Sequence, residues 1–168
     1  MLPLKRILQP TDFSEPSDYA FRLACSLARD YGACLTVLHV VLPPLGSAEV
    51  EAHRHPESYF AGIWKELRRY QSPAENVSLE HRLEQGDPAR EILRVAQEIG
   101  ADLIVLGTHG RRGVARALLG SVAEQVVRRA SCSVLTVKVP VPQLQPASVL
   151  AQETPDKTVE ATQDRFGQ

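Results

Sequence analysis

The chain has 168 residues, a formal net charge of −1 and 43% hydrophobic residues, values typical of a single soluble globular domain with a proper core. This charge excludes a general attraction to nucleic acid, and no apolar run approaches membrane-spanning length, so we expect neither nucleic acid nor a membrane as partner. Three cysteines, Cys25, Cys34 and Cys132, lack the spacing of a disulfide framework or a zinc site, which indicates a reducing, cytoplasmic compartment.

The first half of the chain predicts two strands, each followed by a helix. Leu4–Gln9 is an apolar run that we expect to end as a strand at Pro10. Ser14 is placed to cap the next helix, whose apolar residues recur three and four positions apart. Cys34–Leu42 predicts a second buried strand, and Ser58–Gln71 predicts a helix with its apolar side chains on one side.

The second half continues the alternation of strands and helices. Val77–Leu83 alternates apolar and polar residues as an edge strand does, and Ala89–Gly100 predicts a helix after a Gly-Asp-Pro turn. Asp102–Leu106 is a short apolar run typical of a buried strand. A further helix is expected to open at Gly120-Ser121, and Ser133–Val139 predicts the last strand.

Regular alternation of strand and helix favours an α/β fold. We expect a doubly wound, Rossmann-like, mostly parallel five-stranded sheet in the order 3-2-1-4-5, with helices on both faces. The chain then reverses direction between the first and fourth strands, whose carboxyl ends flank a ligand crevice. From Pro140 the apolar periodicity is lost, so we expect one domain over residues 1–140 and a flexible tail over 141–168.

The segment over residues 107–121, GTHGRRGVARALLGS, predicts a phosphate site. Gly107 follows a buried strand, Gly110 comes three residues later, and Gly120-Ser121 follows nine intervening residues at the start of a helix. Glycine lets a ligand approach the backbone, and the unpaired N–H groups of a helix N-terminus attract anions. The alternative is ordinary structure, with a glycine at a strand end and Ser121 as a helix cap.

Several segments together closely resemble the universal stress protein family, over Leu4–Val139. These are PTDFSEPS at 10–17, LHVV at 38–41, GDPAREI at 86–92 and the run from GTHGRRG to VLTV at 107–137. The most specific element is the family's nucleotide-binding pattern, G-x-x-G, nine residues and G-[S/T], which Gly107, Gly110, Gly120 and Ser121 match completely.

The resemblance implies an ATP site with Mg or Mn on the phosphates. It places adenine against Val41 and the backbone near Pro10 and Thr11, with Asp12 toward the adenosine moiety. It assigns ribose and phosphates to the fourth strand and the glycine segment, namely Leu106, Gly107, His109, Gly110, Gly120, Ser121 and Val122. Two alternatives stay open from the residues: Asp12 as an Asx-turn before the first helix, and His109 as a residue that closes its loop.

The resemblance further implies a stress-response regulator that uses ATP to change its conformation or its choice of protein partner, and a homodimer through the last strand. We expect binding rather than catalysis, because the chain has no Ser-His-Asp motif, no paired metal carboxylates and no Walker lysine. The alternative is an adenine-nucleotide enzyme, either a slow ATPase or an adenylating or pyrophosphatase-type relative. Those enzymes carry S-G-G-x-D-S or H-I-G-H signatures, which Pro10–Ser17 lacks.

Overall fold

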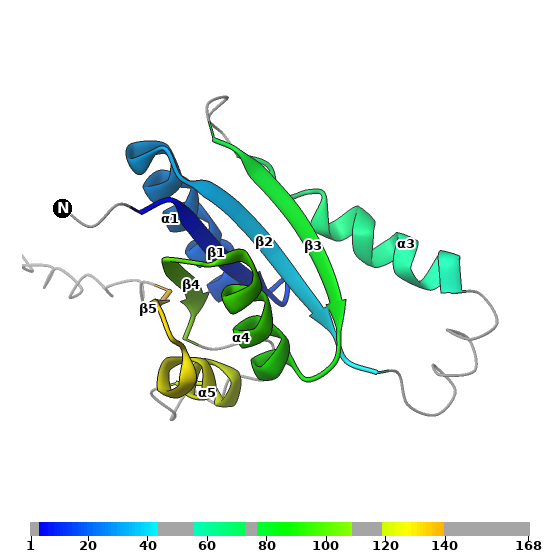
Figure 1. The fold of residues 1–168 in the computed structure, drawn as a ribbon. Helices are drawn as coiled ribbons and strands as arrows, with labels where there is room; N and C mark the ends of the chain where they lie inside the picture. The colour runs from blue at the N-terminus through cyan, green and yellow to red at the C-terminus, as the bar shows by residue number, and fades with distance from the viewer. Residues whose placement is uncertain (1–3, 44–55, 73–76, 109–118, 140–168) are drawn as a thin grey trace, which may run out of the picture.

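The computed structural model describes residues 4–43, 56–72, 77–108 and 119–139, and the expected tail over 141–168 lies outside them. One parallel sheet of five strands has the order β3-β2-β1-β4-β5, which confirms the expected fold and strand order (Figure 1). In chain order the elements are β1 (Arg6–Thr11), α1 (Glu15–Tyr31), β2 (Cys34–Val41), α3 (Pro56–Leu67), β3 (Leu79–Gln85), α4 (Pro88–Ile99), β4 (Leu103–Gly107), α5 (Ser121–Arg129) and β5 (Ser133–Val137).

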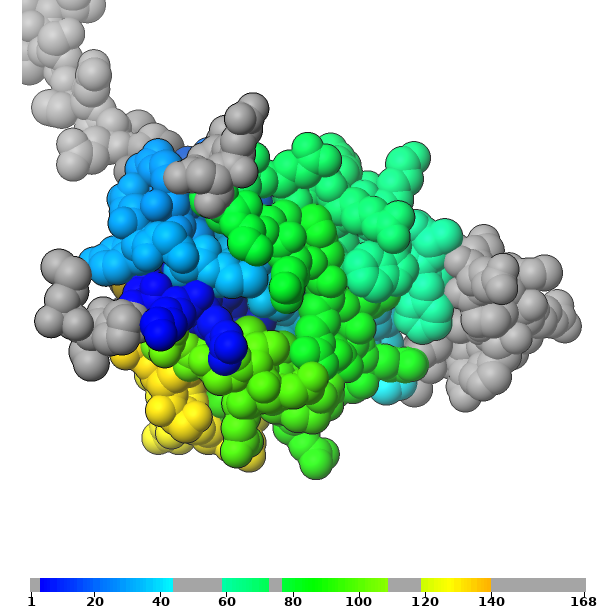
Figure 2. Space-filling view, turned by 45° about the horizontal axis from the view of Figure 1, so that its top comes forward, coloured from blue at the N-terminus to red at the C-terminus, as the bar shows by residue number. Residues whose placement is uncertain are grey.

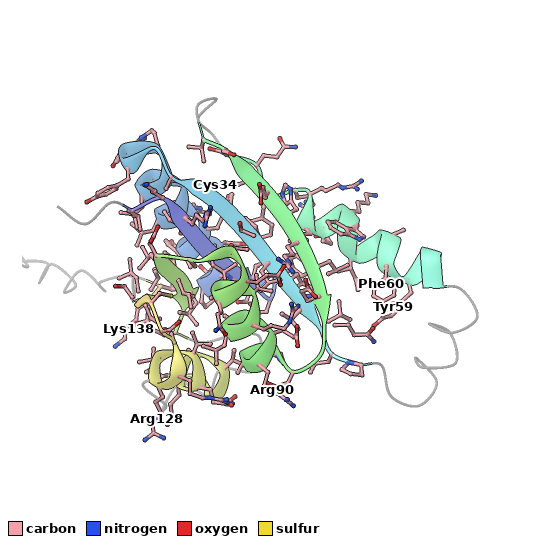
Figure 3. The ribbon with its side chains drawn as sticks, viewed as in Figure 1. Cys34, Tyr59, Phe60, Arg90, Arg128 and Lys138 are labelled. Carbon is pink, nitrogen blue, oxygen red and sulfur yellow. The ribbon has the colours of Figure 1, made fainter. Side chains whose placement is uncertain are left out.

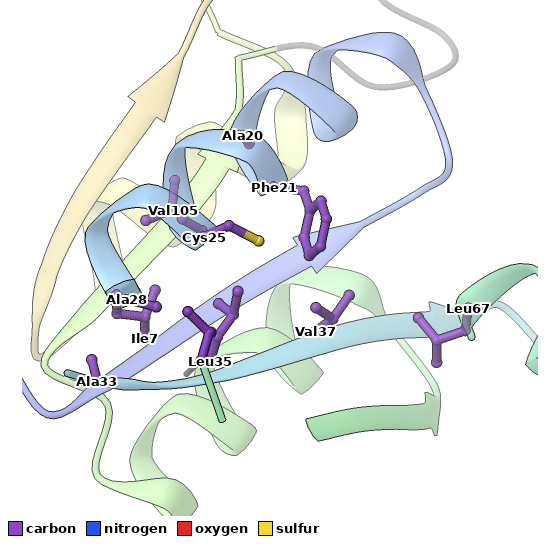
Figure 4. Packing of buried hydrophobic residues seen from close by; sticks show 12 residues of the cluster. Ile7, Ala20, Phe21, Cys25, Ala28, Ala33, Leu35, Val37, Leu67 and Val105 are labelled. Atoms are coloured by element: carbon purple, nitrogen blue, oxygen red, sulfur yellow. The ribbon is translucent and has the colours of Figure 1, made fainter. Parts of the chain in front are cut away.

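Helices cover both faces of the sheet. In β1, Ile7 and Leu8 are both fully buried but belong to different core clusters, because successive strand side chains point to opposite faces. The cluster around Ile7 packs α1 and the end of α3 against the sheet (Figure 4), whereas the cluster around Leu8 packs α4 and α5. The sheet is thus buried between two helical layers, which leaves its strand ends for a ligand.

β1 does not end before Pro10 as expected, because it runs through the proline to Thr11. The carbonyl of Arg6 accepts from the Asp102 amide on the β4 side, and backbone direction alternates along a strand, so the proline nitrogen also faces β4. The ladder between β1 and β4 has ended there, with Leu8↔Ile104 as its last pair. The missing N–H of Pro10 therefore costs the sheet no hydrogen bond.

The remaining boundaries differ from the expected ones by a few residues. α3 was expected over Ser58–Gln71 but spans Pro56–Leu67, since the Arg69 and Tyr70 amides bond carbonyls three residues back and so tighten the chain out of α-helical geometry. β5 ends at Val137, two residues before the expected end. Within the described ranges, no helix is both long and apolar enough to cross a membrane.

Candidate functional site

The carboxyl ends of β1 and β4 lie where the winding of the sheet reverses. β1 pairs with β4 only at Ile7↔Leu103 and Leu8↔Ile104, although β1 continues to Thr11 and β4 to Gly107. The last residues of both strands are therefore not tied to each other by ladder hydrogen bonds. This is the position at which open α/β sheets bind their ligands.

The glycine segment connects the end of β4 to the start of α5, as its sequence predicts. The Gly120 amide donates to the Thr108 carbonyl at 2.7 Å, and the Thr108 amide donates to the Val137 carbonyl at 2.9 Å. The helix start is thus held beside the strand end, although eleven residues lie between Thr108 and Gly120 in the chain. His109 and Gly110, two of the expected site residues, lie outside the described residues.

α5 begins with Gly120 as its cap residue, not with Ser121 as in the alternative interpretation. Gly120 has φ −69° and ψ 157°, its carbonyl accepts from the Glu124 amide at 2.9 Å, and glycine has no side chain with which to cap this end. Ser121 is the first helical residue, and Val122 packs partly against the core beneath α5. The first-turn amides of an α-helix without a side-chain cap are the groups that bind anions.

Gly107 has a packing role that the sequence analysis did not anticipate. A Cβ atom at this position would lie 2.9 Å from the backbone carbon and the Cβ of Pro16, in the first turn of α1. Glycine is therefore needed here because the start of α1 approaches β4 closely. The expected role of Gly107 in admitting a ligand stays a prediction.

Asp12 takes part in a turn directly after β1. Its Oδ1 atom accepts from the Ser14 amide at 3.2 Å and from the Ser14 hydroxyl at 2.5 Å, which is the Asx-turn left open as an alternative. Phe13, the next residue, has φ 62°, and no other described residue except glycine has a positive φ. The turn that the family resemblance places at the adenosine end is thus tightly specified by its own hydrogen bonds.

Thr11 lies at the centre of a polar cluster that the sequence analysis missed. Its hydroxyl is 3.0 Å from the Ser17 hydroxyl and donates to the Tyr70 hydroxyl at 2.9 Å, which in turn donates to Asp18. Burial, together with the Asp18 hydrogen bond, raises the pKa of Tyr70 to about 12. No local signal could reveal Tyr70, because it lies 59 residues from Thr11 in sequence.

His39, in β2, contacts the end of β1. Its Nδ1 atom is 2.7 Å from the Thr11 carbonyl oxygen, so Nδ1 carries the proton and donates it. Its ring stacks on Phe13 with centroids 4.2 Å apart. His39 therefore helps to hold the end of β1 and the turn after it.

The other expected site residues are described but engaged by the fold. Val41 is 6% exposed at the end of β2, and its carbonyl accepts from the Gly86 amide at 2.9 Å. Leu106 is buried in the core beneath α4 and α5. In the described part of the chain, no group of at least three His, Cys, Asp or Glu side chains is arranged to hold a metal ion.

Comparison with known proteins identifies the family to which this chain is similar. Residues 3–138 match the family model described as the universal stress protein family. A universal stress protein of Methanocaldococcus jannaschii is 37% identical over 145 residues, which cover 81% of this chain and 83% of that protein. A solved universal stress protein of Lactobacillus plantarum, 24% identical, shares the fold with a TM-score of 0.68 over 82% of this chain and 99% of its own.

A further solved relative was crystallised with a nucleotide. This universal stress protein in complex with cAMP is 28% identical and aligns with a TM-score of 0.63 over 81% of this chain and 98% of its own.

Proposed function

This chain belongs to the universal stress protein family, and we propose that it binds ATP at the carboxyl ends of β1, β2 and β4. The observation that carries the proposal is the hydrogen bond from the Gly120 amide to the Thr108 carbonyl, which fixes the start of α5 beside the end of β4. The first turn of α5 has a glycine as its cap residue and lies where the strand order reverses, which suits it to phosphate groups.

The adenosine end of the proposed site is the turn after β1. Asp12 and the backbone near Thr11 would meet the base or ribose, with Val41 at the end of the neighbouring strand. The relative solved with cAMP supports an adenine nucleotide as the ligand class. We propose the triphosphate because the glycine pattern and the helix start with its glycine cap are both suited to binding phosphate groups.

A divalent cation, Mg²⁺ or Mn²⁺, would accompany the phosphates. Its charge offsets that of the triphosphate, and Asp12, at the adenosine end, is the carboxylate that the resemblance assigns to the site. The Asp12 Oδ1 atom is engaged by Ser14, which supports a cation held by phosphate oxygens and water.

We propose regulation by occupancy rather than catalysis. Asp12 belongs to the turn at the adenosine end, away from the expected phosphates, so no described side chain is placed to activate water there. The competing function is an adenine-nucleotide enzyme. A steady-state phosphate-release assay distinguishes the two: turnover near or above about 1 per second that collapses in His109→Ala or in Asp12→Ala favours the enzyme, whereas slower release favours the regulator.

The edge position of β5 supports a homodimer through this strand. In this proposal the protein acts in the cytoplasm on a regulatory partner.

Binding is tested by calorimetric titration of ATP with Mg²⁺. We expect one saturable site per chain in the wild type and weaker binding in Asp12→Ala. Absence of heat from a folded wild-type sample would refute the proposal.

A further inference from the structure

A chain of oxygen atoms lies behind the turn that ends β1. The Thr11 hydroxyl oxygen is 3.0 Å from that of Ser17 and 2.9 Å from that of Tyr70. The Tyr70 hydroxyl lies 2.5 Å from Oδ1 of Asp18. These residues come from β1, from the first turn of α1 and from the segment after α3, so the network joins three parts of the fold.

The protons available to this network are limited, and this fixes the directions of its bonds. A carboxylate and a carbonyl can only accept, so Tyr70 donates to Asp18 and Ser17 donates to the Ser14 carbonyl at 2.7 Å. The single hydroxyl proton of Thr11 is then left for Tyr70 or Ser17. The geometry gives this proton to the Tyr70 hydroxyl oxygen, which accepts from Thr11 at 2.9 Å, while the Ser17 oxygen lies at 3.0 Å.

The Thr11 hydroxyl oxygen stabilises the turn that contains Asp12, because it accepts a hydrogen bond from that turn. The Phe13 amide donates to the Thr11 hydroxyl oxygen at 3.0 Å, and Phe13 has φ 62°. A non-glycine residue keeps such a backbone conformation only where its surroundings enforce it. The hydroxyl of Tyr70 therefore acts on the Asp12 turn through Thr11.

Tyr70 is itself firmly placed. The Nε2 atom of His81, in β3, donates to the Tyr70 carbonyl at 2.7 Å. The Tyr70 ring packs edge-to-face on Phe21, with centroids 4.8 Å apart at 85°. Burial keeps its pKa near 12, so the hydroxyl stays a donor at neutral pH. Because Tyr70 is held in place in this way, a displacement of the Asp12 turn can be transmitted to α3, and a displacement of α3 to the turn.

We infer that Tyr70 is a positioning residue of the nucleotide site: its hydroxyl sets the Thr11–Ser14 turn and couples occupancy of the site to α3. This inference rests on the proposed function. Leu67, the last residue of α3, is fully buried three positions before Tyr70. α3 lies on the surface (Figure 2), and Tyr59 and Phe60 occupy its outer part, away from the sheet (Figure 3). A shift of α3 would therefore change a surface that a protein partner can contact.

The chain carries its own reporter of such a shift. Trp64, the single tryptophan, lies on α3 with the Arg68 guanidinium over its ring at 5.4 Å from the centroid. Indole emission responds to the position of a neighbouring charge. A change in Trp64 fluorescence on ATP binding would therefore report movement at α3.

The test compares Tyr70→Phe, which removes only the hydroxyl, with Tyr31→Phe, a matched change at an exposed tyrosine. Titration with Mg-ATP is followed by calorimetry and by Trp64 fluorescence. We expect Tyr70→Phe to weaken binding at least about five-fold and to reduce the fluorescence change per ATP bound, with Tyr31→Phe at wild-type values. Val95→Ala, a core truncation beneath α4 on the other face of the sheet, controls for lost stability and should retain wild-type affinity.

The outcomes separate this inference from the proposed function. If the wild type binds no ATP, the proposed function fails and the coupling fails with it. If the wild type binds and Tyr70→Phe matches it in affinity and fluorescence, only the inference is overturned. Hydrogen exchange without nucleotide gives an independent readout: the Phe13 amide should exchange faster in Tyr70→Phe, and unchanged exchange would overturn the positioning role.

Discussion

At the residue scale, Gly107 and Gly62 differ in what a side chain would meet. A Cβ at Gly107 would lie 2.9 Å from atoms of Pro16, whereas nothing lies within 4 Å of one at Gly62 in α3. We expect Gly107→Ala to lower the free energy of unfolding by about 1–3 kcal/mol through overpacking. Gly62→Ala, the matched control, should raise it by about 0.5–1 kcal/mol because alanine favours helix. Urea denaturation measures both, and equal effects would contradict the packing role of Gly107.

Tyr70 gives the protein a pH dependence in the alkaline range. Its pKa is raised from 10.0 to about 12, so the folded state holds the phenol proton more tightly than the unfolded state. The stability this contributes is complete below pH about 10 and is lost as the pH rises toward about 12. Burial raises the pKa of Cys25 from 9.0 to about 11, which acts in the same direction, so the comparison belongs in a Cys25→Ala background.

In that background, urea denaturation between pH 9 and 12 should show that stability falls less steeply with pH in Tyr70→Phe than in the protein that keeps Tyr70. If stability fell equally steeply with pH in both proteins, the phenol of Tyr70 would titrate alike in the folded and unfolded states.

The sequence predicts site residues where the local pattern carries the chemistry, and fails where residues meet only through the fold. The spacing of Gly107, Gly120 and Ser121 places a helix start beside a strand end, and the structure has this arrangement. The cluster of Thr11 with Tyr70 and Asp18 has no such pattern, since it joins three separate elements. The close approach of Pro16 to Gly107 likewise depends on how α1 packs, not on either residue's neighbours.

At the scale of elements, the start of α5 makes a prediction about Gly120. Its φ of −69° and ψ of 157° are open to any residue, so glycine is not needed there for backbone conformation. We expect Gly120→Val to fold, as judged by circular dichroism, but to bind ATP at least about ten-fold more weakly, because a branched side chain would occupy the space before the first-turn amides. Gly120→Ala should lose less. Wild-type affinity in folded Gly120→Val would place the phosphates elsewhere.

Element types and order follow from periodicity, while element ends depend on tertiary partners. β1 continues through Pro10 because the ladder on the β4 side has already ended, a fact that the sequence of β1 does not contain. α3 ends at Leu67 because its last turn tightens, although the apolar spacing continues. The ends of these elements are therefore set by tertiary packing more than by local propensity.

For the whole molecule, the position of β5 at the end of the strand order makes a prediction about assembly. The Val137 carbonyl faces β4, so by alternation Thr136 directs its backbone groups away from the sheet. Thr136→Pro removes an outward N–H without breaking the β4 ladder. In sedimentation analysis we expect the wild type to behave as a dimer and Thr136→Pro as a folded monomer. The control, Leu135→Pro, removes an inward N–H and should unfold more readily. A dimeric Thr136→Pro protein would exclude pairing through this edge.

Amide chemical shifts distinguish binding of an adenine nucleotide at the carboxyl ends of β1 and β4 from binding elsewhere on the protein. A titration of isotope-labelled protein with Mg-ATP should shift the signals of Asp12, Thr108, Ser121 and Val122 together, with one saturation curve. Signals at the opposite ends of the same strands, such as Arg6 and Leu103, should stay in place. Absence of shifts in a folded sample, or shifts confined to the surface of α3, would contradict binding at these strand ends.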